Sequence, residues 1–200
     1  MAQKWNQKIL YIAPWPGAGL WTKKEVKTLA DLKGLKTRTY DKNGALVMEA
    51  VGATPLALPF SEVYTSLQTG VIDSVMTSSP TAVDAKFWEV LKYFEPLNIT
   101  IATNMVTVNL KAFEKLPKAQ QDALVKAGKE MEAAMWKGVK KWDADMVNIS
   151  KKNGIKVVAP SKKLISDLEK ITENIRAEWL KGAPPEAKQI YAEFKKKVKR

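Results

Sequence analysis

Cysteine and histidine are both absent from this 200-residue sequence. Their absence excludes disulfide bonds, thiol chemistry, Cys/His zinc sites and general-base catalysis by histidine. The carboxylates are scattered without the paired spacing of glycosidases, and PGAG at residues 16–19 matches no phosphate-binding motif. We therefore expect a protein that is not an enzyme and that needs no cofactor.

Long apolar runs are missing as well. No stretch approaches the roughly 18 apolar residues that a membrane-spanning helix needs. The N-terminal MAQKWNQK lacks the apolar core of a signal peptide. The sequence as it stands predicts neither a membrane span nor an export signal.

The charge is strongly one-sided, with 33 basic against 21 acidic residues and a net charge of +12. The excess comes from lysines at helix-surface spacing and from a C-terminal tail, KKKVKR. A basic nucleic-acid-binding domain is one alternative, but no RNP-like aromatic block, zinc-finger spacing or arginine-rich helix accompanies the charge. We favour a solvated basic surface and expect no nucleic-acid partner.

Arginine is scarce in this lysine-rich chain and occurs only as Arg38, Arg176 and Arg200. Arg38 lies in the segment GLKTRTY, residues 34–40. A guanidinium presents a planar fork of donors that fits a carboxylate, whereas lysine is a flexible point charge. Arg38 is therefore either a carboxylate anchor or an ordinary solvated arginine on a polar strand face.

The hydrophobic pattern alternates strands with helices. It predicts strands at residues 8–13, 34–40, 54–58, 71–76 and 155–158, one extended stretch at 99–110, and helices at 29–33, 45–51, 62–69, 81–90, 117–152, 161–180 and 186–197. Short strand–helix–strand connections are typical of an α/β fold with a mainly parallel sheet flanked by helices. The longest helix would reach about 50 Å, which suits a bridge between two lobes.

The carboxyl ends of parallel strands are where ligands bind in such sheets. Arg38, Phe60 and Thr77 all fall at or just past predicted strand ends. This convergence favours the interpretation of Arg38 as part of a binding site.

Four further residues are candidates because of their chemistry. Trp15 and Trp21 flank a Pro/Gly loop and are either stacking surfaces for a ligand or loop anchors. Tyr40 ends the arginine segment, and Asn104 lies in the middle of the extended stretch. We include Trp15, Tyr40 and Asn104 among the expected ligand-binding residues.

Three blocks of the sequence carry a recognisable pattern: DLKGLKTR at 31–38, GATP at 52–55, and PFSEVYTSLQTGVID at 59–73. Together they closely resemble the substrate-binding proteins of TRAP transporters (tripartite ATP-independent periplasmic, the DctP type). The resemblance continues through KFWEV at 86–90 and KLP at 115–117, so it covers essentially the whole chain. The longest block is the most specific.

The resemblance implies a periplasmic-binding-protein-like fold of two lobes that closes on an organic acid. Such a protein works in the periplasm and delivers its ligand to a membrane permease driven by an ion gradient. The family's motif assigns the carboxylate contact to Arg38. It also implies that Phe60 lines the pocket and that Thr77 contacts the ligand.

Two departures from the family pattern narrow the expectation. Met76 stands where members that bind a metal with the substrate carry a glutamate, and a thioether is a poor ligand for a hard cation, so we expect no metal. Around Ala18 the sequence lacks the further arginine of the sialic-acid branch. A small or apolar monocarboxylate is therefore expected in place of a sugar acid.

The resemblance also implies that roughly the first third of the family's chain is absent. Residues 16–103 and 144–200 would then form the second, ligand-binding lobe. Residues 1–15 and 104–143 would be remnants of the first lobe together with the inter-lobe helix.

Such remnants would leave apolar side chains, including Met131, Met135 and Trp136, without their usual sheet. We therefore expect a homo-oligomer or a domain swap through these residues. The alternative to an acid-binding protein is a ligand-incompetent lobe that only associates with itself or with a permease.

Overall fold

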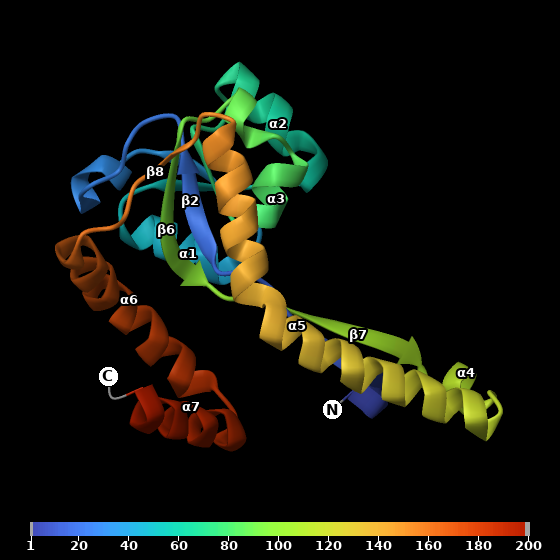
Figure 1. The fold of residues 1–200 in the computed structure, drawn as a ribbon. Helices are drawn as coiled ribbons and strands as arrows, with labels where there is room; N and C mark the ends of the chain where they lie inside the picture. Colours follow the sequence, from blue (N-terminus) through green and yellow to red (C-terminus); the bar gives the residue numbers. More distant parts are fainter. Residues whose placement is uncertain (1, 199–200) are drawn as a thin grey trace.

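The computed structural model describes residues 2–198, so Met1, Lys199 and Arg200 lie outside the described part. The strands are β1 (Gln7–Pro14), β2 (Ala18–Thr22), β3 (Lys36–Thr39), β4 (Thr54–Ala57), β5 (Ser74–Thr77), β6 (Tyr93–Thr100), β7 (Thr103–Asn109) and β8 (Lys156–Val157). The α-helices are α1 (Lys42–Ala50), α2 (Phe60–Thr69), α3 (Ser79–Asp84), α4 (Leu110–Glu114), α5 (Lys118–Lys152), α6 (Lys162–Gly182) and α7 (Pro185–Val198). Short 3-10 helices occur at Ala2–Trp5, Leu29–Leu32 and Phe87–Glu89. Figure 1 shows their arrangement.

The strands within residues 2–198 form two separate sheets. The larger has six strands in the order β4-β3-β5-β2-β6-β8, and β2 runs antiparallel to both of its neighbours while the other five strands point the same way. This confirms the prediction of a mainly parallel α/β sheet. The smaller sheet is a two-stranded antiparallel ribbon of β1 and β7.

Both faces of the large sheet are buried, because successive side chains of a strand point to opposite sides. On one face Leu20 packs with Met48 of α1 and Leu164 of α6. On the other face Trp21 packs with Val63 of α2 and Phe87. All five residues of β2 are buried, so this strand lies at the centre of both cores.

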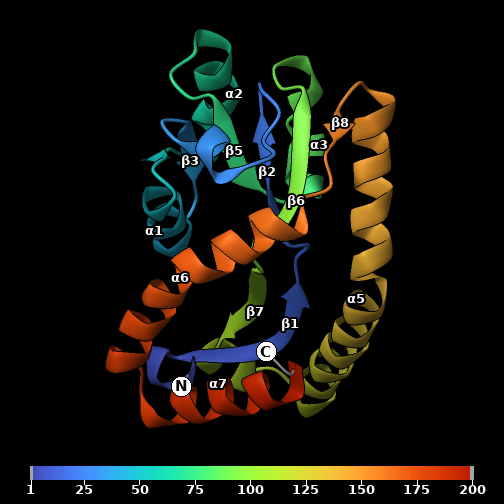
Figure 2. The same ribbon diagram turned by 90° about the vertical axis from the view of Figure 1, so that its left-hand side faces the viewer.

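Three segments connect the large sheet to the ribbon: Trp15–Gly17 between β1 and β2, Ile101–Ala102 between β6 and β7, and the helix α5 (Figures 1 and 2). The helix is continuous from Lys118 to Lys152 and passes alongside both sheets. No helix within residues 2–198 is long and apolar enough to cross a membrane. Whether the chain divides into lobes at the expected boundaries stays a prediction.

Several sequence predictions need correction. The segments Ala18–Thr22 and Tyr93–Thr100 are strands, although neither was predicted as one and Ala18–Gly19 fell within the expected Pro/Gly loop. The helix expected at 81–90 is two short helices separated by Lys86, whose φ of 49° breaks the α-helix. The extended stretch at 99–110 is interrupted at residues 101–102 and ends in α4.

Two helix ends carry the local features that usually stabilise such ends. The Ser161 hydroxyl accepts a hydrogen bond from the Leu164 N–H at 3.1 Å and caps α6. Gly52 follows α1 with a φ of 79°, a left-handed conformation that glycine adopts without steric cost.

Gly128 allows α5 to approach the ribbon closely. A Cβ atom at this position would lie 2.6 Å from the carbonyl oxygen of Leu10 in β1. The helix is fixed there by Glu132, whose carboxylate accepts a hydrogen bond from the Ile12 N–H at 2.8 Å. Gly138, almost three turns further along α5, has no atom within 4 Å of its would-be Cβ.

Replacing Gly128 with Ala should therefore destabilise the protein, by about 1–3 kcal/mol, because α5 must move away from β1. Gly138→Ala is the matched control and should stabilise by up to about 1 kcal/mol, the ordinary helix-propensity gain. Urea unfolding of both variants measures the difference. Equal stabilisation by the two substitutions would show that the close approach is not a constraint.

Glu95 of β6 is a carboxylate buried in the sheet. Its side chain is fully inaccessible and accepts hydrogen bonds from the Val26 N–H at 3.1 Å and the Thr22 hydroxyl at 3.5 Å. Burial raises the pKa of Glu95 from 4.5 to about 7, because the charged form is poorly solvated there. The folded chain therefore holds a proton that the unfolded chain releases between these two values.

The free energy of unfolding should consequently fall as the pH rises from about 4.5 to about 7, by up to roughly 3 kcal/mol from this group. Glu95→Gln keeps an acceptor for the Val26 N–H and should remove that part of the decline. Unfolding titrations at about pH 5 and about pH 8 measure it. The control is Glu49→Gln on the exposed face of α1, whose free energy of unfolding should fall with pH as the parent's does. If Glu95→Gln showed the same pH dependence as the parent, Glu95 would not be its source.

Candidate functional site

The carboxyl edge of the large sheet brings most of the predicted residues together. Strands β3, β4, β5 and β6 all end there, and β2 begins there, with Gly19 opposite Thr77 and Ala18 opposite Thr100. Arg38, Tyr40, Phe60 and Thr77 lie at or just past these strand ends. This edge faces the connections to the ribbon (Figure 1).

Arg38 is a buried cation without a counter-ion in the described structure. It lies on β3 between Leu56 of β4 and Val75 of β5, and 7% of its surface is exposed. Its Nε donates to the carbonyl oxygen of Leu58 at 3.2 Å, and it makes no ion pair within residues 2–198. Burial lowers the pKa of the guanidinium, which nevertheless stays protonated at neutral pH. The two terminal amino groups remain available to a carboxylate ligand.

Tyr40 forms a bridge across the edge. Its ring lies under the Arg38 guanidinium, with 5.9 Å from the guanidinium carbon to the ring centroid. Its hydroxyl is hydrogen bonded to the Thr100 hydroxyl at the end of β6. Burial raises the pKa of Tyr40, so the phenol is neutral and can donate. Tyr40 thus supports the guanidinium from below and ties β3 to β6.

Thr77 and Phe60 supply different surfaces to the edge. Thr77 is the last residue of β5 and is 4% exposed, and its carbonyl oxygen accepts a hydrogen bond from Trp21 Nε1 at 3.2 Å. Phe60 is the first residue of α2, directly after Pro59, and 45% of its surface is exposed. An exposed aromatic ring at such an edge can cover the apolar part of a bound acid.

Trp15 lies where the sheet, the ribbon and α5 meet. Its indole Nε1 donates to the Ser78 hydroxyl at 2.6 Å, and its ring packs edge-to-face on Trp142 of α5 at a centroid distance of 5.1 Å. Its backbone N–H donates to the Ala102 carbonyl at 3.0 Å. Ser78 directly follows Thr77, so Trp15 contacts the neighbour of a residue that was predicted to contact the ligand.

Trp21, by contrast, is fully buried and stacks on Phe94 at a centroid distance of 4.0 Å. This burial excludes Trp21 as a stacking surface for a ligand.

Asn104 lies on the ribbon, close to its junction with the large sheet. It is exposed on β7, opposite Ala13 of β1. Its side chain has no hydrogen bond to any other predicted site residue in the described part of the chain. The structure therefore groups five of the six predicted residues near the sheet edge and leaves Asn104 on the ribbon.

Sequence reasoning missed the polar contacts that tie α5 to this edge. The Ser79 hydroxyl donates to the Asp143 carboxylate of α5, and the neighbouring Ser78 hydroxyl is 3.0 Å from that of Thr81. Nothing in the sequence pairs the segment SSP at 78–80 with residues so far along the chain.

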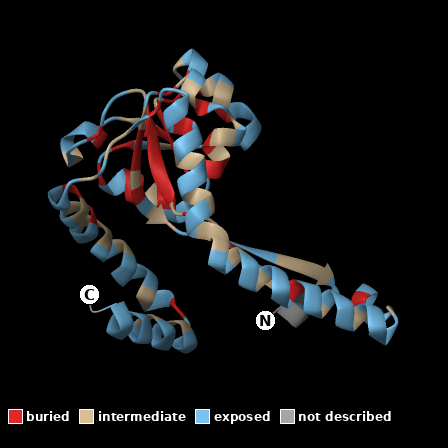
Figure 3. Ribbon diagram, in the orientation of Figure 1, coloured by how far each residue is buried: buried red, intermediate tan, exposed pale blue. Residues whose placement is uncertain are grey.

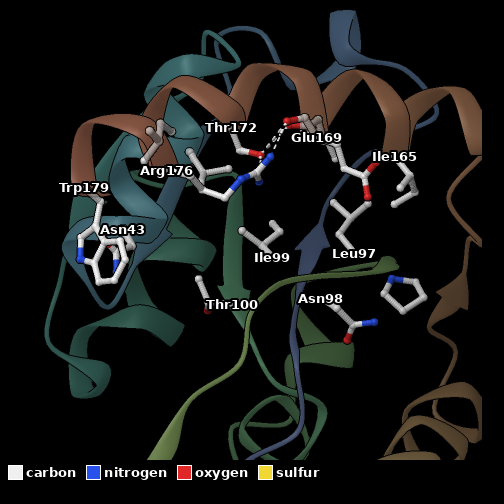
Figure 4. A pocket seen from close by; sticks show the side chains of 14 residues that line it. Asn43, Leu97, Asn98, Ile99, Thr100, Ile165, Glu169, Thr172, Arg176 and Trp179 are labelled. Atoms are coloured by element: carbon white, nitrogen blue, oxygen red, sulfur yellow. Dashed lines mark hydrogen bonds between the residues drawn. The ribbon is translucent and has the colours of Figure 1, made fainter. Parts of the chain in front are cut away.

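A groove of about 620 Å³ lies beside the edge, between α1, β6 and α6. Figure 4 shows Arg176 extending from α6 above Ile99, with hydrogen bonds to the Thr172 hydroxyl at 2.9 Å and the Glu169 carbonyl at 3.1 Å. None of the six predicted residues lines this groove. It touches the predicted site only through Thr100, the hydrogen-bond partner of Tyr40.

The fold is of the α/β class and the carboxyl edge of its large sheet carries a buried cation, and comparison with known proteins gives the family. Residues 6–182 match the family described as bacterial extracellular solute-binding protein, family 7 (DctP). The chain belongs to this family of TRAP solute-binding proteins. Its members are receptors and not enzymes.

Three relatives illustrate the likeness. The chain is 31% identical to the monocarboxylate 2-oxoacid-binding periplasmic protein of Nostoc sp. strain PCC 7120, over 88% of this chain and 49% of the other. DctP7 of Bordetella pertussis, a receptor binding pyroglutamic acid, matches at a TM-score of 0.89 and 30% identity, over 96% of this chain and 64% of that one. DctP6 of the same organism, which also binds pyroglutamic acid, matches at 0.84 and 35%, over 90% and 60%. The chain therefore spans about half the length of its curated relatives and less than two thirds of these solved structures.

The contact between Trp15 and Ser78 should contribute measurably to stability. Trp15→Phe keeps an aromatic ring against Trp142 but removes the hydrogen bond, and Ser78→Ala removes the same bond from the other side. The double-mutant cycle should give a coupling of about 1 kcal/mol in urea unfolding. The control is Trp179→Phe, at a tryptophan of α6 that is 52% exposed, and it should change the free energy of unfolding little. A coupling energy of zero would mean that the hydrogen bond between Trp15 and Ser78 does not stabilise this junction.

Proposed function

We propose that this chain binds a small organic monocarboxylate at the carboxyl edge of the large sheet. Arg38 anchors the carboxylate, Phe60 and Tyr40 contact the body of the ligand, and Thr77 contributes its hydroxyl. Trp15 holds the neighbouring junction through Ser78. The carrying observation is that Arg38 is 7% exposed and has no counter-ion within residues 2–198.

A buried cation without a partner is costly, because it has lost much of its hydration without gaining a compensating charge. The cost is offset when an anion enters and accepts hydrogen bonds from the guanidinium fork. Arg38 therefore favours an anionic ligand at this position over a neutral one. The polar strand ends and the exposed Phe60 ring suit a ligand that is small and partly apolar.

The relatives support a monocarboxylate. DctP7 and DctP6 bind pyroglutamic acid, and the Nostoc relative is named for monocarboxylate 2-oxoacids. Both ligand classes carry one carboxylate close to a carbonyl group. We extend this chemistry to the present chain and infer that its ligand presents one carboxylate to Arg38 and one acceptor to the hydroxyls of the edge.

The proposal extends to cellular role. As a member of an extracellular solute-binding family, the chain would act in the periplasm and pass its ligand to a TRAP membrane permease. Residues 16–103 and 144–200 would form the lobe that carries Arg38. Residues 1–15 and 104–143 would move relative to that lobe through the three connections at its edge.

Arg38→Ala should abolish binding of the acid. A thermal-shift and calorimetric screen would use pyroglutamate and 2-oxoacids at up to about 10 mM, a range that detects affinities from micromolar to millimolar. Loss of the charge-assisted contact should weaken any detected affinity by at least about a hundredfold. Arg38→Lys should recover only part of it, because an ammonium lacks the planar fork.

Arg176→Ala provides the matched control, since it removes the other described arginine, on α6 away from the predicted site. It should bind as the parent does. Equal binding by Arg38→Ala and the parent would refute the role of Arg38. No binding of any acid by a folded parent chain would instead favour the ligand-incompetent alternative.

A further inference from the structure

The end of the molecule opposite the ribbon carries a cluster of lysines. Strands β3, β5, β6 and β8 begin at this amino edge of the large sheet, and β2 and α5 end there. Figure 2 shows β8 and the end of α5 at the top of the view, with the ribbon and α7 at the bottom. Five exposed lysines belong to this end and are called the lysine edge: Lys24, Lys92, Lys151, Lys152 and Lys156.

Backbone hydrogen bonds hold these lysines close to one another. The Lys92 N–H donates to the carbonyl oxygen of Thr22 at 3.0 Å, and the chain continues from Thr22 to Lys24. The Lys156 N–H donates to the Lys92 carbonyl oxygen at 2.8 Å, and Lys156 follows the last turn of α5 after a short turn. Neighbouring strands lie about 4.8 Å apart, so the three strand ends span only about 10 Å.

The lysine edge has no counter-charge of its own. None of its five ammonium groups makes an ion pair within residues 2–198. The carboxylates near this end have other partners: Glu25 lies 2.9 Å from Lys27 Nζ, Asp73 lies 3.9 Å from Lys36 Nζ, Asp31 accepts from the N–H groups of Lys27 and Thr28, and Glu89 accepts from the Tyr64 hydroxyl. Lys151 and Lys152 suit the C-terminus of α5, where a cation offsets the helix dipole. The three strand-end lysines have no such role.

The chemistry of this edge favours a broad anionic surface over a single small anion. Of the described arginines, Arg38 lies at the carboxyl edge and Arg176 on α6, so no planar fork is available here to bind one defined carboxylate or phosphate. Neither the groove beside α6 nor the one between α6 and α7 is lined by any of the five lysines. Flexible point charges on an open surface respond to the density of negative charge.

An exposed apolar side chain at the same end favours a lipid surface. Val71 is 49% exposed and follows Gly70, whose carbonyl oxygen accepts a hydrogen bond from Lys36 Nζ at 2.5 Å. Interfacial proteins combine lysines with apolar side chains that enter the headgroup region. Figure 3 shows the end of α5 as exposed, so no other described element covers it.

Two other occupants fit less well. The chain belongs to an extracellular family, which makes nucleic acid a poor candidate. A second copy of this chain would bring the same five lysines or another part of a surface with a net charge of +12, and like charges repel.

We propose that the lysine edge docks on a bilayer surface that contains anionic phospholipid. The five ammonium groups lie at the headgroup phosphates, and Val71 enters the headgroup region beside them. This role goes beyond the proposed function, since neither Arg38 nor the ribbon takes part in it.

The test is sedimentation of the whole chain with lipid vesicles, without any organic acid. Vesicles of phosphatidylcholine mixed with phosphatidylglycerol should carry the chain down at low salt, and vesicles of phosphatidylcholine alone should not. Raising the salt towards about 1 M, where the Debye length is about 3 Å, should release it. Changing Lys92, Lys151, Lys152 and Lys156 together to Gln should weaken binding at least about tenfold, because each lysine near an anionic surface contributes a factor of roughly five.

The matched control removes four exposed lysines from the part of α5 nearer the ribbon. Changing Lys126, Lys129, Lys137 and Lys140 together to Gln lowers the net charge equally and should leave vesicle binding close to that of the parent. Thermal unfolding checks that both quadruple variants are folded.

Three outcomes would overturn the proposal. One is a folded parent chain that stays in solution with phosphatidylglycerol vesicles at low salt. Another is an equal loss of binding in the two quadruple variants, which would make the net charge responsible in place of this edge. The third is binding to polyglutamate without binding to vesicles, which would make an acidic polypeptide the partner. Because no acid is present, failure of Arg38 to bind a ligand would change none of these results.

Discussion

The reversed strand β2 is the constraint on which the rest of the structure depends. It lies between β5 and β6, antiparallel to both, and its five residues are all buried. Gly19 makes this possible, because a Cβ there would lie 2.5 Å from the Glu95 carbonyl oxygen. The strand joins the two cores through Leu20 and Trp21, and Trp21 fixes the backbone of Thr77. Because β2 begins at the carboxyl edge, the segment that connects it to the ribbon also lies at the proposed site.

Arg38 differs in kind from the cations that give the chain its charge. Lys118, Lys141 and Lys163 pair with carboxylates one helical turn away on exposed surfaces. Such pairs contribute little to stability and are screened by salt. Arg38 is instead buried between parallel strands, where solvent ions screen charge weakly. The lack of a counter-ion therefore carries a larger free-energy cost there than at the surface. One buried guanidinium therefore says more about function than the net charge of +12.

Sequence reasoning identified the parallel part of the sheet because its signals are local. Strands β3, β4 and β5 alternate with short helices, and the rule that ligands lie at carboxyl ends then placed Arg38, Phe60 and Thr77. It failed at β2 and β6, whose sequences AGLWT and YFEPLNIT contain glycine, proline and buried glutamate. Pro96 is tolerated because β8 pairs only with Tyr93 and Phe94, so one side of β6 is an open edge beyond them. The glycine, proline and glutamate in these two strands are accommodated by contacts with residues distant in sequence, which the local pattern does not show.

The proposed ligand site and the ribbon are connected by a few shared contacts. Trp15 binds Ser78 through its indole and Trp142 through its ring, and Ser79 binds Asp143 of α5. A displacement of the ribbon relative to the large sheet must therefore break these contacts or move the residues that follow Thr77. The helix α5 and the strand β7 would move together, since β1 contacts both of them. Closure around an acid at Arg38 would then depend on how rigidly the ribbon is held, and a two-stranded ribbon has little stability of its own.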